Sequence, residues 1–281
     1  MKPQINRVEI NITELCNRTC FFCPRGHGYE NLNLHMTPEV AEQVFIQTEP
    51  YTNFISMAGR GEPLLGKYLY EICELSVKYD KYMRIITNGD KLEKHITQLD
   101  NILDLKTEQE KMLVNCYDGS QQEQDWKIKY KDYSSIRFVS SRQTIDENEH
   151  KERKFYGLTN RGGSVPFDVD RFSSDHEPDI DSDMALMNVF EMPCYYLYFK
   201  TFINYNGDVN LCCHDWKVIR NFGNIMQKNF AEIWEHGLLN HYRQQLKSGQ
   251  RQNFLECKNC DSTQEWETQL QYYNEFGKYY E

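Results

Sequence analysis

The sequence predicts an α/β protein, a partial (β/α)6 barrel followed by a small domain with a β-hairpin and a helix. Residues 7 to about 160 alternate short apolar runs with longer amphipathic ones, which is the pattern of βα units on a parallel sheet. Asn206-Gly207, between two apolar runs, is a favoured two-residue hairpin turn. The 281 residues can form one large and one small domain. We expect the barrel at 1–163, a connector at 164–192 and the C-terminal domain at 193–281.

Six apolar runs are expected to form the strands of the barrel, at residues 8–12, 54–57, 83–87, 112–116, 136–139 and 155–158. The clearest helix lies between the first two strands. Thr37 can cap it, Pro38 suits its first position, and Glu39 favours the positive end of the helix dipole. Its body, residues 40–47, ends before Pro50. Residues 68–79 and 92–103 are expected to form further helices.

The composition changes between residues 164 and 192, where segment 173–183 is polar and acidic, as exposed linkers are. Its spaced carboxylates suggest calcium, but the Gly and the closing Glu of an EF-hand loop are absent. We therefore interpret it as a flexible connector or a lid. Beyond it, residues 196–205 and 208–213 are expected to form the hairpin, and a helix is expected from residue 231 to about 246.

Charge and hydropathy exclude several classes of protein. The net charge of -10 argues against a general nucleic-acid surface, because binding phosphates needs a basic patch. The mean hydropathy of -0.75 and the absence of a long apolar run argue against a membrane protein. No signal peptide is visible at the N-terminus, so we expect a cytoplasmic protein. There the ten cysteines favour metal or redox chemistry over disulfides.

Three of these cysteines, Cys16, Cys20 and Cys23, follow the first expected strand with the spacing C-x3-C-x2-C. Three thiolates fit three corners of a cubane iron–sulfur cluster and leave one iron free to bind a small molecule. A zinc knuckle or three incidental thiols are the alternatives. Zinc sites more often use paired C-x2-C units or include His, whereas clusters favour all-thiolate ligation at short spacing. Cys73 and Cys116 lie in apolar contexts and are interpreted as plain buried thiols.

Four further cysteines, in the C-terminal part, could fill all four corners of a second cluster: Cys194, Cys212, Cys257 and Cys260. A structural zinc site is the alternative. A straight hairpin would place Cys212 opposite Thr201 and leave Cys194 roughly 23 Å away along the strand. The chain must therefore bend after Cys194. Cys213 competes with Cys212 for the role, and the spacing from Gly207 favours Cys212.

The N-terminal cysteine motif resembles that of the radical S-adenosylmethionine (SAM) enzymes, and Phe22 holds the aromatic place common before the third cysteine. The resemblance implies that Cys16, Cys20 and Cys23 ligate a [4Fe–4S] cluster whose free iron chelates SAM. Reductive cleavage of SAM would then give a 5′-deoxyadenosyl radical that abstracts hydrogen from a substrate. A flavodoxin or a ferredoxin is the expected electron donor.

Glycine-rich and polar turns follow the later strands, where such sheets place their chemistry. Two glycines in Gly59-Arg60-Gly61-Glu62-Pro63 let the backbone approach a ligand closely, although an ordinary βα turn is an alternative. This turn resembles the family's GGEP motif, which contacts the SAM amino group, but Arg60 adds a charge there. The resemblance implies that SAM is bound by Gly59, Arg60, Gly61, Glu62, Thr87, Asn88, Asn115 and Arg161.

Two residues are candidates for contacting the substrate. Arg161, framed by Asn160 and two glycines, could make a bidentate contact with a carboxylate or with vicinal hydroxyls. A solvated arginine in a turn is the alternative. Glu9, on the first expected strand, is a candidate to face the interior of the barrel.

The C-terminal cysteines resemble the twitch domain, the short form of the SPASM extension of radical SAM enzymes, as do the segments 222–225 and 231–234. With two [4Fe–4S] clusters, the second could accept an electron from the substrate radical. We therefore expect a radical SAM oxidoreductase that dehydrogenates a sugar or cyclitol alcohol. Epimerisation or cross-linking of a peptide is one alternative, and a non-catalytic, zinc-stabilised binding protein is another.

Overall fold

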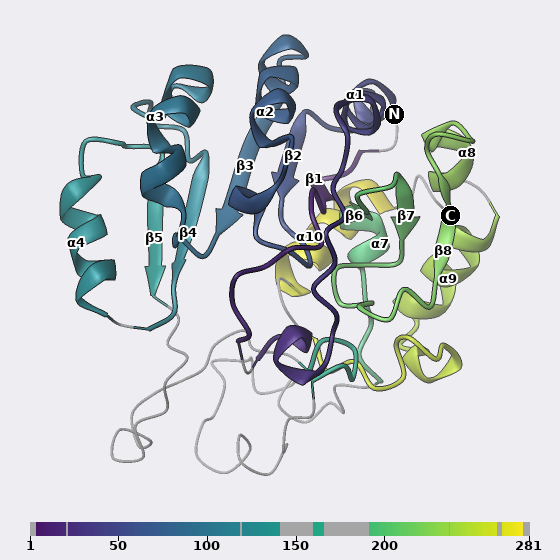
Figure 1. The fold of residues 1–281 in the computed structure, drawn as a ribbon. Coiled ribbons are helices and arrows are strands. Elements are labelled where there is room, and N and C mark those ends of the chain that lie inside the picture. The colour runs from purple at the N-terminus through teal and green to yellow at the C-terminus, as the bar shows by residue number, and fades with distance from the viewer. Residues whose placement is uncertain are drawn as a thin grey trace, which may run out of the picture.

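The computed structural model describes residues 4–20, 22–118, 120–140, 160–165, 191–235, 237–262 and 266–277. Its centre is an eight-stranded sheet with the order β5-β4-β3-β2-β1-β6-β7-β8 (Figure 1). The strands are β1 (Arg7–Ile10), β2 (Phe54–Met57), β3 (Tyr82–Thr87), β4 (Met112–Cys116), β5 (Ile136–Ser140), β6 (Lys200–Ile203), β7 (Asp208–Asn210) and β8 (Asn221–Asn224).

Strands β5, β4, β3, β2, β1 and β6 pair in parallel with one another, and the described strands do not close into a full barrel. The predicted partial barrel is therefore confirmed. The first five expected strands are all present, within two residues at each end. The sixth, residues 155–158, lies outside the described residues.

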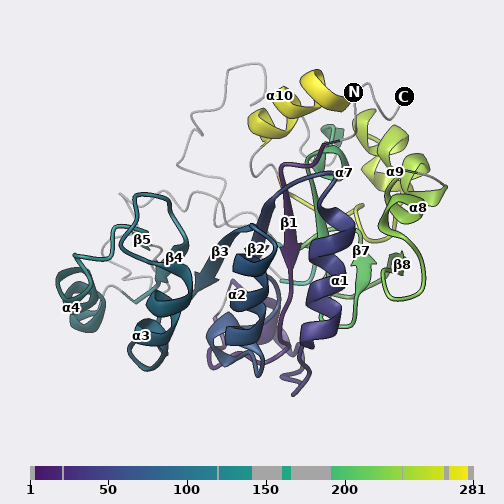
Figure 2. The ribbon, with the colours of Figure 1, turned by 90° about the horizontal axis from the view of Figure 1, so that it is seen from above.

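Helices α1 (Pro38–Thr48), α2 (Leu69–Lys78) and α3 (Leu92–Leu103) pack side by side against one face of the sheet (Figure 2). Helix α4 (Gln121–Lys129) follows β4. The predicted start of α1 is confirmed, since the Thr37 side chain accepts a hydrogen bond from the Val40 N–H and Pro38 opens the helix. Strands β3 and β4 alternate buried and half-buried residues, and their buried side chains join those of α2 and α3 in one core.

The expected strand at 196–205 is partly wrong. Residues Tyr196–Phe199 form the short helix α7, and only then does β6 begin. Four consecutive apolar residues fit a buried helical turn as well as a strand, so periodicity could not separate the two. All four are buried, and α7 packs against helices α9 (Leu238–Lys247) and α10 (Trp266–Phe276). This helix is the predicted bend after Cys194.

The hairpin at Asn206-Gly207 is present, with Phe202 of β6 opposite Asn210 of β7. Its second strand is shorter than expected and ends at Asn210. Strand β6 also pairs in parallel with β1, with Val8 opposite Thr201, so the hairpin extends the barrel sheet. The C-terminal part is thus continuous with the sheet of the barrel.

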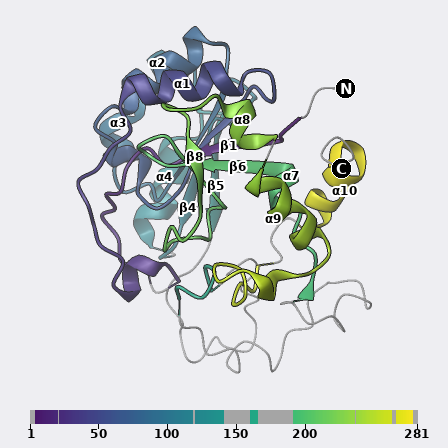
Figure 3. The same ribbon diagram turned by 90° about the vertical axis from the view of Figure 1, so that its right-hand side faces the viewer.

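The expected helix at 231–246 consists of two helices, α8 (Phe230–Trp234) and α9, with Gly237 at a φ of 67° between them. Figure 3 shows α8, α9 and α10 around β6 and α7. The described residues also include the short 3₁₀ helices η1 (Pro24–His27), η2 (Pro63–Leu65) and η4 (Arg251–Asn253). Among the described helices, none has the length and apolarity that crossing a membrane requires.

Candidate active site

A cavity of about 370 Å³ lies where the carboxyl ends of β1 to β4 meet. Parallel strands place their following loops along one edge of the sheet, so motifs far apart in the sequence converge there. Every residue that the sequence suggested for the first cluster, SAM or substrate lines this cavity: Glu9, Cys16, Cys20, Cys23, Gly59, Arg60, Gly61, Glu62, Thr87, Asn88, Asn115 and Arg161. The structure thus brings all of them together.

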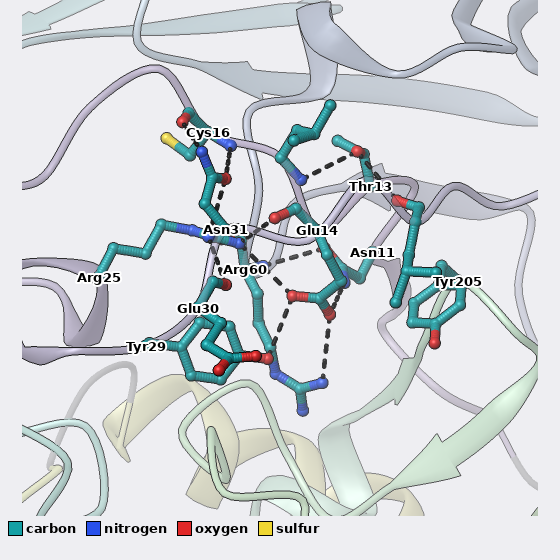
Figure 4. A network of polar contacts seen from close by, with 12 residues as sticks. Asn11, Thr13, Glu14, Cys16, Arg25, Tyr29, Glu30, Asn31, Arg60 and Tyr205 are labelled. Atoms are coloured by element: carbon teal, nitrogen blue, oxygen red, sulfur yellow. Dashed lines mark hydrogen bonds and ion pairs between the residues drawn. The ribbon is translucent and has the colours of Figure 1, made fainter.

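Arg25 holds the loop that carries the first three cysteines (Figure 4). Its Nε donates to the carbonyl of Arg60 at 2.6 Å, and its Nη2 donates to the carbonyl of Glu14 at 2.6 Å. Its Nη1 reaches Asn31 Oδ1 at 3.2 Å. Asn31 in turn accepts from the Cys16 N–H at 2.9 Å and donates to the Cys16 carbonyl at 3.1 Å. The cysteine loop is therefore fastened to the turn after β2.

The three thiols of this loop are close enough to affect one another. Burial raises the pKa of Cys16 and Cys23, and it raises that of Cys20 to about 12, with further contributions from Cys23 and Cys16. Binding a metal must therefore displace their protons, because thiolates are the ligands. Three thiols of one short loop that face one cavity suit a cluster with one open iron.

The glycines of the turn after β2 are required by the protein's own backbone. A Cβ at Gly61 would lie 2.1 Å from the Thr13 carbonyl oxygen and 2.7 Å from that of Leu15. Gly59 has a φ of 145°, and a Cβ there would lie 2.7 Å from Asn11 Oδ1. Close packing against the loop after β1 is thus a reason for these glycines that sequence reasoning missed, because it considered only a ligand or an ordinary βα turn.

The side chain of Arg60 is almost fully buried and connects this turn with the C-terminal part. One Nη donates to the carbonyl of Asp215 at 3.0 Å, and the guanidinium lies 5.1 Å from the ring centre of Phe202. It also pairs with Glu14, with 3.7 Å between Nη1 and Oε1 (Figure 4). Sequence reasoning treated Arg60 only as an added charge near SAM and missed these contacts, because nothing local signals them.

Glu62 joins the turns after β2 and β3. It accepts hydrogen bonds from Thr87 Oγ1 at 2.5 Å and from the Asn88 N–H at 2.8 Å. Burial raises its pKa to about 6, although these hydrogen bonds oppose the increase. The carboxylate is therefore destabilised in the protein alone, and a cationic group in the cavity would relieve the cost.

A second cluster of polar side chains surrounds Glu9 at the first cavity. The carboxylate accepts from Tyr196 Oη at 2.9 Å, from Lys200 Nζ at 3.3 Å and from Arg7 Nε at 3.4 Å. Burial alone would raise the pKa of Glu9, but the Lys200 and Arg7 charges prevail and lower it to about 2. Sequence reasoning missed Lys200 and Tyr196. A lysine inside an otherwise apolar run was the signal that could have revealed Lys200.

A second cavity, of about 40 Å³, is lined by the four C-terminal cysteines Cys194, Cys212, Cys257 and Cys260, together with apolar side chains such as Leu197, Leu211 and Leu246. Cys213 lines the first cavity instead, so two adjacent cysteines face different cavities. Burial raises the pKa of Cys212, Cys257 and Cys260. Cys73 and Cys116 are buried and line neither cavity, as expected of plain thiols.

The turn at 160–163 lies against the C-terminal part. The Asn160 N–H donates to Asp261 Oδ1 at 2.9 Å, and Asn160 Nδ2 donates to the carbonyl of Asn259 at 2.6 Å. A Cβ at Gly162 would lie 2.9 Å from the His214 carbonyl oxygen. These contacts bring Arg161 to the first cavity from the side of the second. Among the described residues, no three His, Cys, Asp or Glu side chains gather closely enough to hold a single metal ion.

Comparison with protein families agrees with this arrangement. Residues 10–110 match the radical SAM superfamily, and residues 194–261 match SPASM, an iron–sulfur cluster-binding domain. The chain therefore contains a radical SAM domain followed by a SPASM domain. It is thus a radical SAM enzyme whose family cofactors are SAM and iron–sulfur clusters.

Two relatives illustrate the range of the superfamily. This radical SAM chain is 24% identical over 266 residues to the SAM-dependent 2-deoxy-scyllo-inosamine dehydrogenase of Niallia circulans, covering 93% of this chain and 95% of that one. It is 36% identical over 101 residues to a probable GTP 3′,8-cyclase of Methanococcus aeolicus, covering only 34% of this chain and 33% of that one. Full-length similarity thus links it to the dehydrogenase.

Solved structures share the fold of this radical SAM enzyme. BtrN in complex with AdoMet and 2-DOIA has a TM-score of 0.70 at 23% identity and covers 94% of this chain and 95% of its own. SuiB of Streptococcus suis bound to the precursor peptide SuiA has a TM-score of 0.53 at 15% identity and covers 92% of this chain and 70% of its own. The same fold therefore occurs in a complex with 2-DOIA and in a complex with a precursor peptide.

Proposed function

We propose that this radical SAM enzyme uses two [4Fe–4S] clusters to dehydrogenate an alcohol carbon of a sugar or cyclitol. The observation that supports this most is the position of Cys212 and Cys213, which are adjacent in sequence and line different cavities. The first cavity and the cavity with four thiols are therefore lined by neighbouring residues of the same backbone segment. The full-length similarity to a cyclitol dehydrogenase adds support.

In this proposal Cys16, Cys20 and Cys23 ligate the first cluster, and Cys194, Cys212, Cys257 and Cys260 ligate the second. When bound, the first cluster with SAM supplies a hydrogen-abstracting 5′-deoxyadenosyl radical, and the second supplies an acceptor for the remaining electron. The backbone of the Gly59–Gly61 turn, with Glu62 and three further polar residues, would hold SAM; the three are Thr87, Asn88 and Asn115. A flavodoxin or a ferredoxin would deliver the first electron.

Glu9 and Arg161 would bind the substrate. The pKa of Glu9 is lowered to about 2, so the carboxylate stays ionised at neutral pH and is a poor proton acceptor. We infer that it accepts a hydrogen bond from a substrate hydroxyl and orients the carbon to be attacked. Arg161 presents a planar guanidinium that can donate two parallel hydrogen bonds to vicinal hydroxyls. Oxidation then removes a hydrogen atom from carbon, a proton from the hydroxyl and one electron.

The test uses polyols and cyclitols deuterated at carbon, incubated with SAM and a reductant. Deuterium in 5′-deoxyadenosine together with a ketone product is expected, and deuterium drawn only from a labelled peptide would favour peptide modification instead. A chain with Cys16, Cys20 and Cys23 all changed to Ala serves as the control. About eight iron per parent chain and about four per control chain are expected for two four-iron clusters. About four in the parent and none in the control would refute the second cluster.

A further inference from the structure

Arg251 is a buried arginine at the second cavity that connects two cysteine-bearing segments. It opens η4, is 2% exposed, and lines the cavity together with the four cysteines. On one side its Nε donates to the Met192 carbonyl at 2.9 Å and its Nη2 to the Pro193 carbonyl at 3.4 Å, next to Cys194. On the other side its Nη1 donates to the carbonyls of Cys260 and Ser262, each at 3.1 Å.

These four hydrogen bonds use the fork geometry of the guanidinium. A single side chain thereby sets the distance between Cys194 and the Cys257–Cys260 pair, which are far apart in sequence. A lysine could not do the same, because its ammonium is a compact point charge with three donors. The geometry therefore requires arginine specifically.

The charge of Arg251 is equally well placed. The negative charge of four thiolates exceeds the positive charge of an oxidised four-iron, four-sulfide core. A fully cysteine-ligated cluster is therefore a net anion. Among the described side chains that line this cavity, Arg251 is the permanent cation. Glu256, the lining carboxylate, receives hydrogen bonds from Tyr242 and Arg220. A buried anion is stabilised most by a cation inside the same low-dielectric region.

We propose that Arg251 is a positioning residue for the second cluster. Its hydrogen bonds bridge the two cysteine-bearing segments that hold the cluster, and its charge raises the reduction potential of the cluster. This rests on the proposed function, since it takes the four C-terminal cysteines as cluster ligands. Reduction adds negative charge to an anion, so a neighbouring cation favours it. A higher potential makes the second cluster a better acceptor for the electron released by substrate oxidation.

The test uses the full chain with Cys16, Cys20 and Cys23 changed to Ala, reconstituted with ferrous iron and sulfide, so that only the second cluster contributes. Arg251→Met removes the charge and the hydrogen bonds, whereas Arg251→Lys removes only the fork geometry. Arg243→Met is the matched control. Arg243 is also fully buried, and it donates to the carbonyls of Leu197 and Trp234, but it does not line the cavity.

Three quantities are measured: the iron content per chain, the rate of iron loss to a chelator, and the midpoint potential of the cluster. The potential comes from a redox titration followed by electron paramagnetic resonance. We expect faster iron loss in both Arg251 variants, and a lower potential in Arg251→Met but not in Arg251→Lys or Arg243→Met. A cluster lost outright only in the Arg251 variants also supports the bridging role. Iron loss and potential in Arg251→Met equal to those of Arg243→Met would overturn the proposal. Absence of iron before any change at Arg251 would instead refute the proposed second cluster.

Discussion

Replacing Gly61 with Ala tests whether the turn after β2 is fixed by its packing against the cysteine loop. The added Cβ would lie 2.1 Å from the Thr13 carbonyl oxygen and 2.7 Å from that of Leu15. Both are backbone atoms, so no side-chain rotation relieves the overlap. Overpacking in a core costs about 1–3 kcal/mol, and an overlap with backbone belongs at the upper end or above. We expect Gly61→Ala to lower the free energy of unfolding by about 3 kcal/mol or more.

The same displacement should affect the first cluster site, because the Thr13–Leu15 backbone leads directly into Cys16. Urea unfolding of the iron-free chain and iron per chain after reconstitution are the two measurements. Gly66→Ala is the control: its Cβ would come within 2.7 Å of the Ile12 Cδ1 atom, the end of a flexible side chain, and would stay 3.0 Å from the nearest backbone atom, the Pro63 carbonyl oxygen. This milder overlap should cost about 1 kcal/mol. We expect about four iron in Gly61→Ala and about eight in Gly66→Ala. Equal stability and equal iron in the two variants would refute the reasoning.

Three further predictions concern named side chains. Cys212→Ser should reduce iron from about eight to about four per chain while Cys213→Ser should not, and equal losses would contradict the separation of the two cavities. Burial raises the pKa of Glu62 from 4.5 to about 6, so the folded chain binds this proton more tightly than the unfolded chain and loses about 2 kcal/mol of stability as pH rises through this range. The unfolding free energy of Glu62→Gln minus that of the parent should therefore be about 2 kcal/mol larger at about pH 7.5 than at about pH 4, and a constant difference would disprove the shift. Glu9→Gln leaves the Lys200 ammonium buried without its carboxylate and should cost about 3–5 kcal/mol, partly recovered by adding Lys200→Met; no recovery in urea unfolding would show that the two are not coupled.

The residues of the first cavity could be predicted because their signals are local. Each cysteine, glycine or polar turn follows an apolar run, and a parallel sheet gathers such turns at one edge whatever their separation in sequence. Cys16, Gly59, Thr87 and Asn115 thus line one cavity although no pairwise contact was predicted. The sheet order of β1 to β5 follows the sequence order of the strands, which made this part of the fold the simplest to predict.

The rest depends on contacts that no local pattern encodes. The parallel pairing of β6 with β1 joins residues about 190 positions apart, and the hairpin signal at Asn206-Gly207 says nothing of a third partner. The same pairing brings Lys200 to Glu9, which explains why this ion pair was missed. Helix α7 was mistaken for a strand because its four residues are all apolar and buried, and a short apolar run fits both structures.

Arg60 shows how a departure from the family's motif is compensated elsewhere in the fold. The backbone of the turn is held independently of the side chain, since the Arg60 N–H donates to Asn11 Oδ1 at 3.0 Å and its carbonyl accepts from Arg25 at 2.6 Å. The side chain instead reaches Asp215, three residues beyond Cys212. Arg60→Gly, which makes the turn more like the family motif, should therefore leave the affinity for SAM within a few-fold of the parent.

Stability should behave differently. Losing a buried, charge-assisted hydrogen bond costs about 1.5–3 kcal/mol, and losing the contact with the Phe202 ring adds about 1 kcal/mol. We expect Arg60→Gly to lower the free energy of unfolding by about 2.5–4 kcal/mol, measured by urea unfolding, with SAM affinity measured by isothermal titration of the reconstituted protein. Lys78→Ala, which breaks an exposed ion pair with Glu42, should change neither quantity appreciably. A large loss of SAM affinity with unchanged stability would mean that the arginine contacts the ligand and does not connect the two halves of the chain.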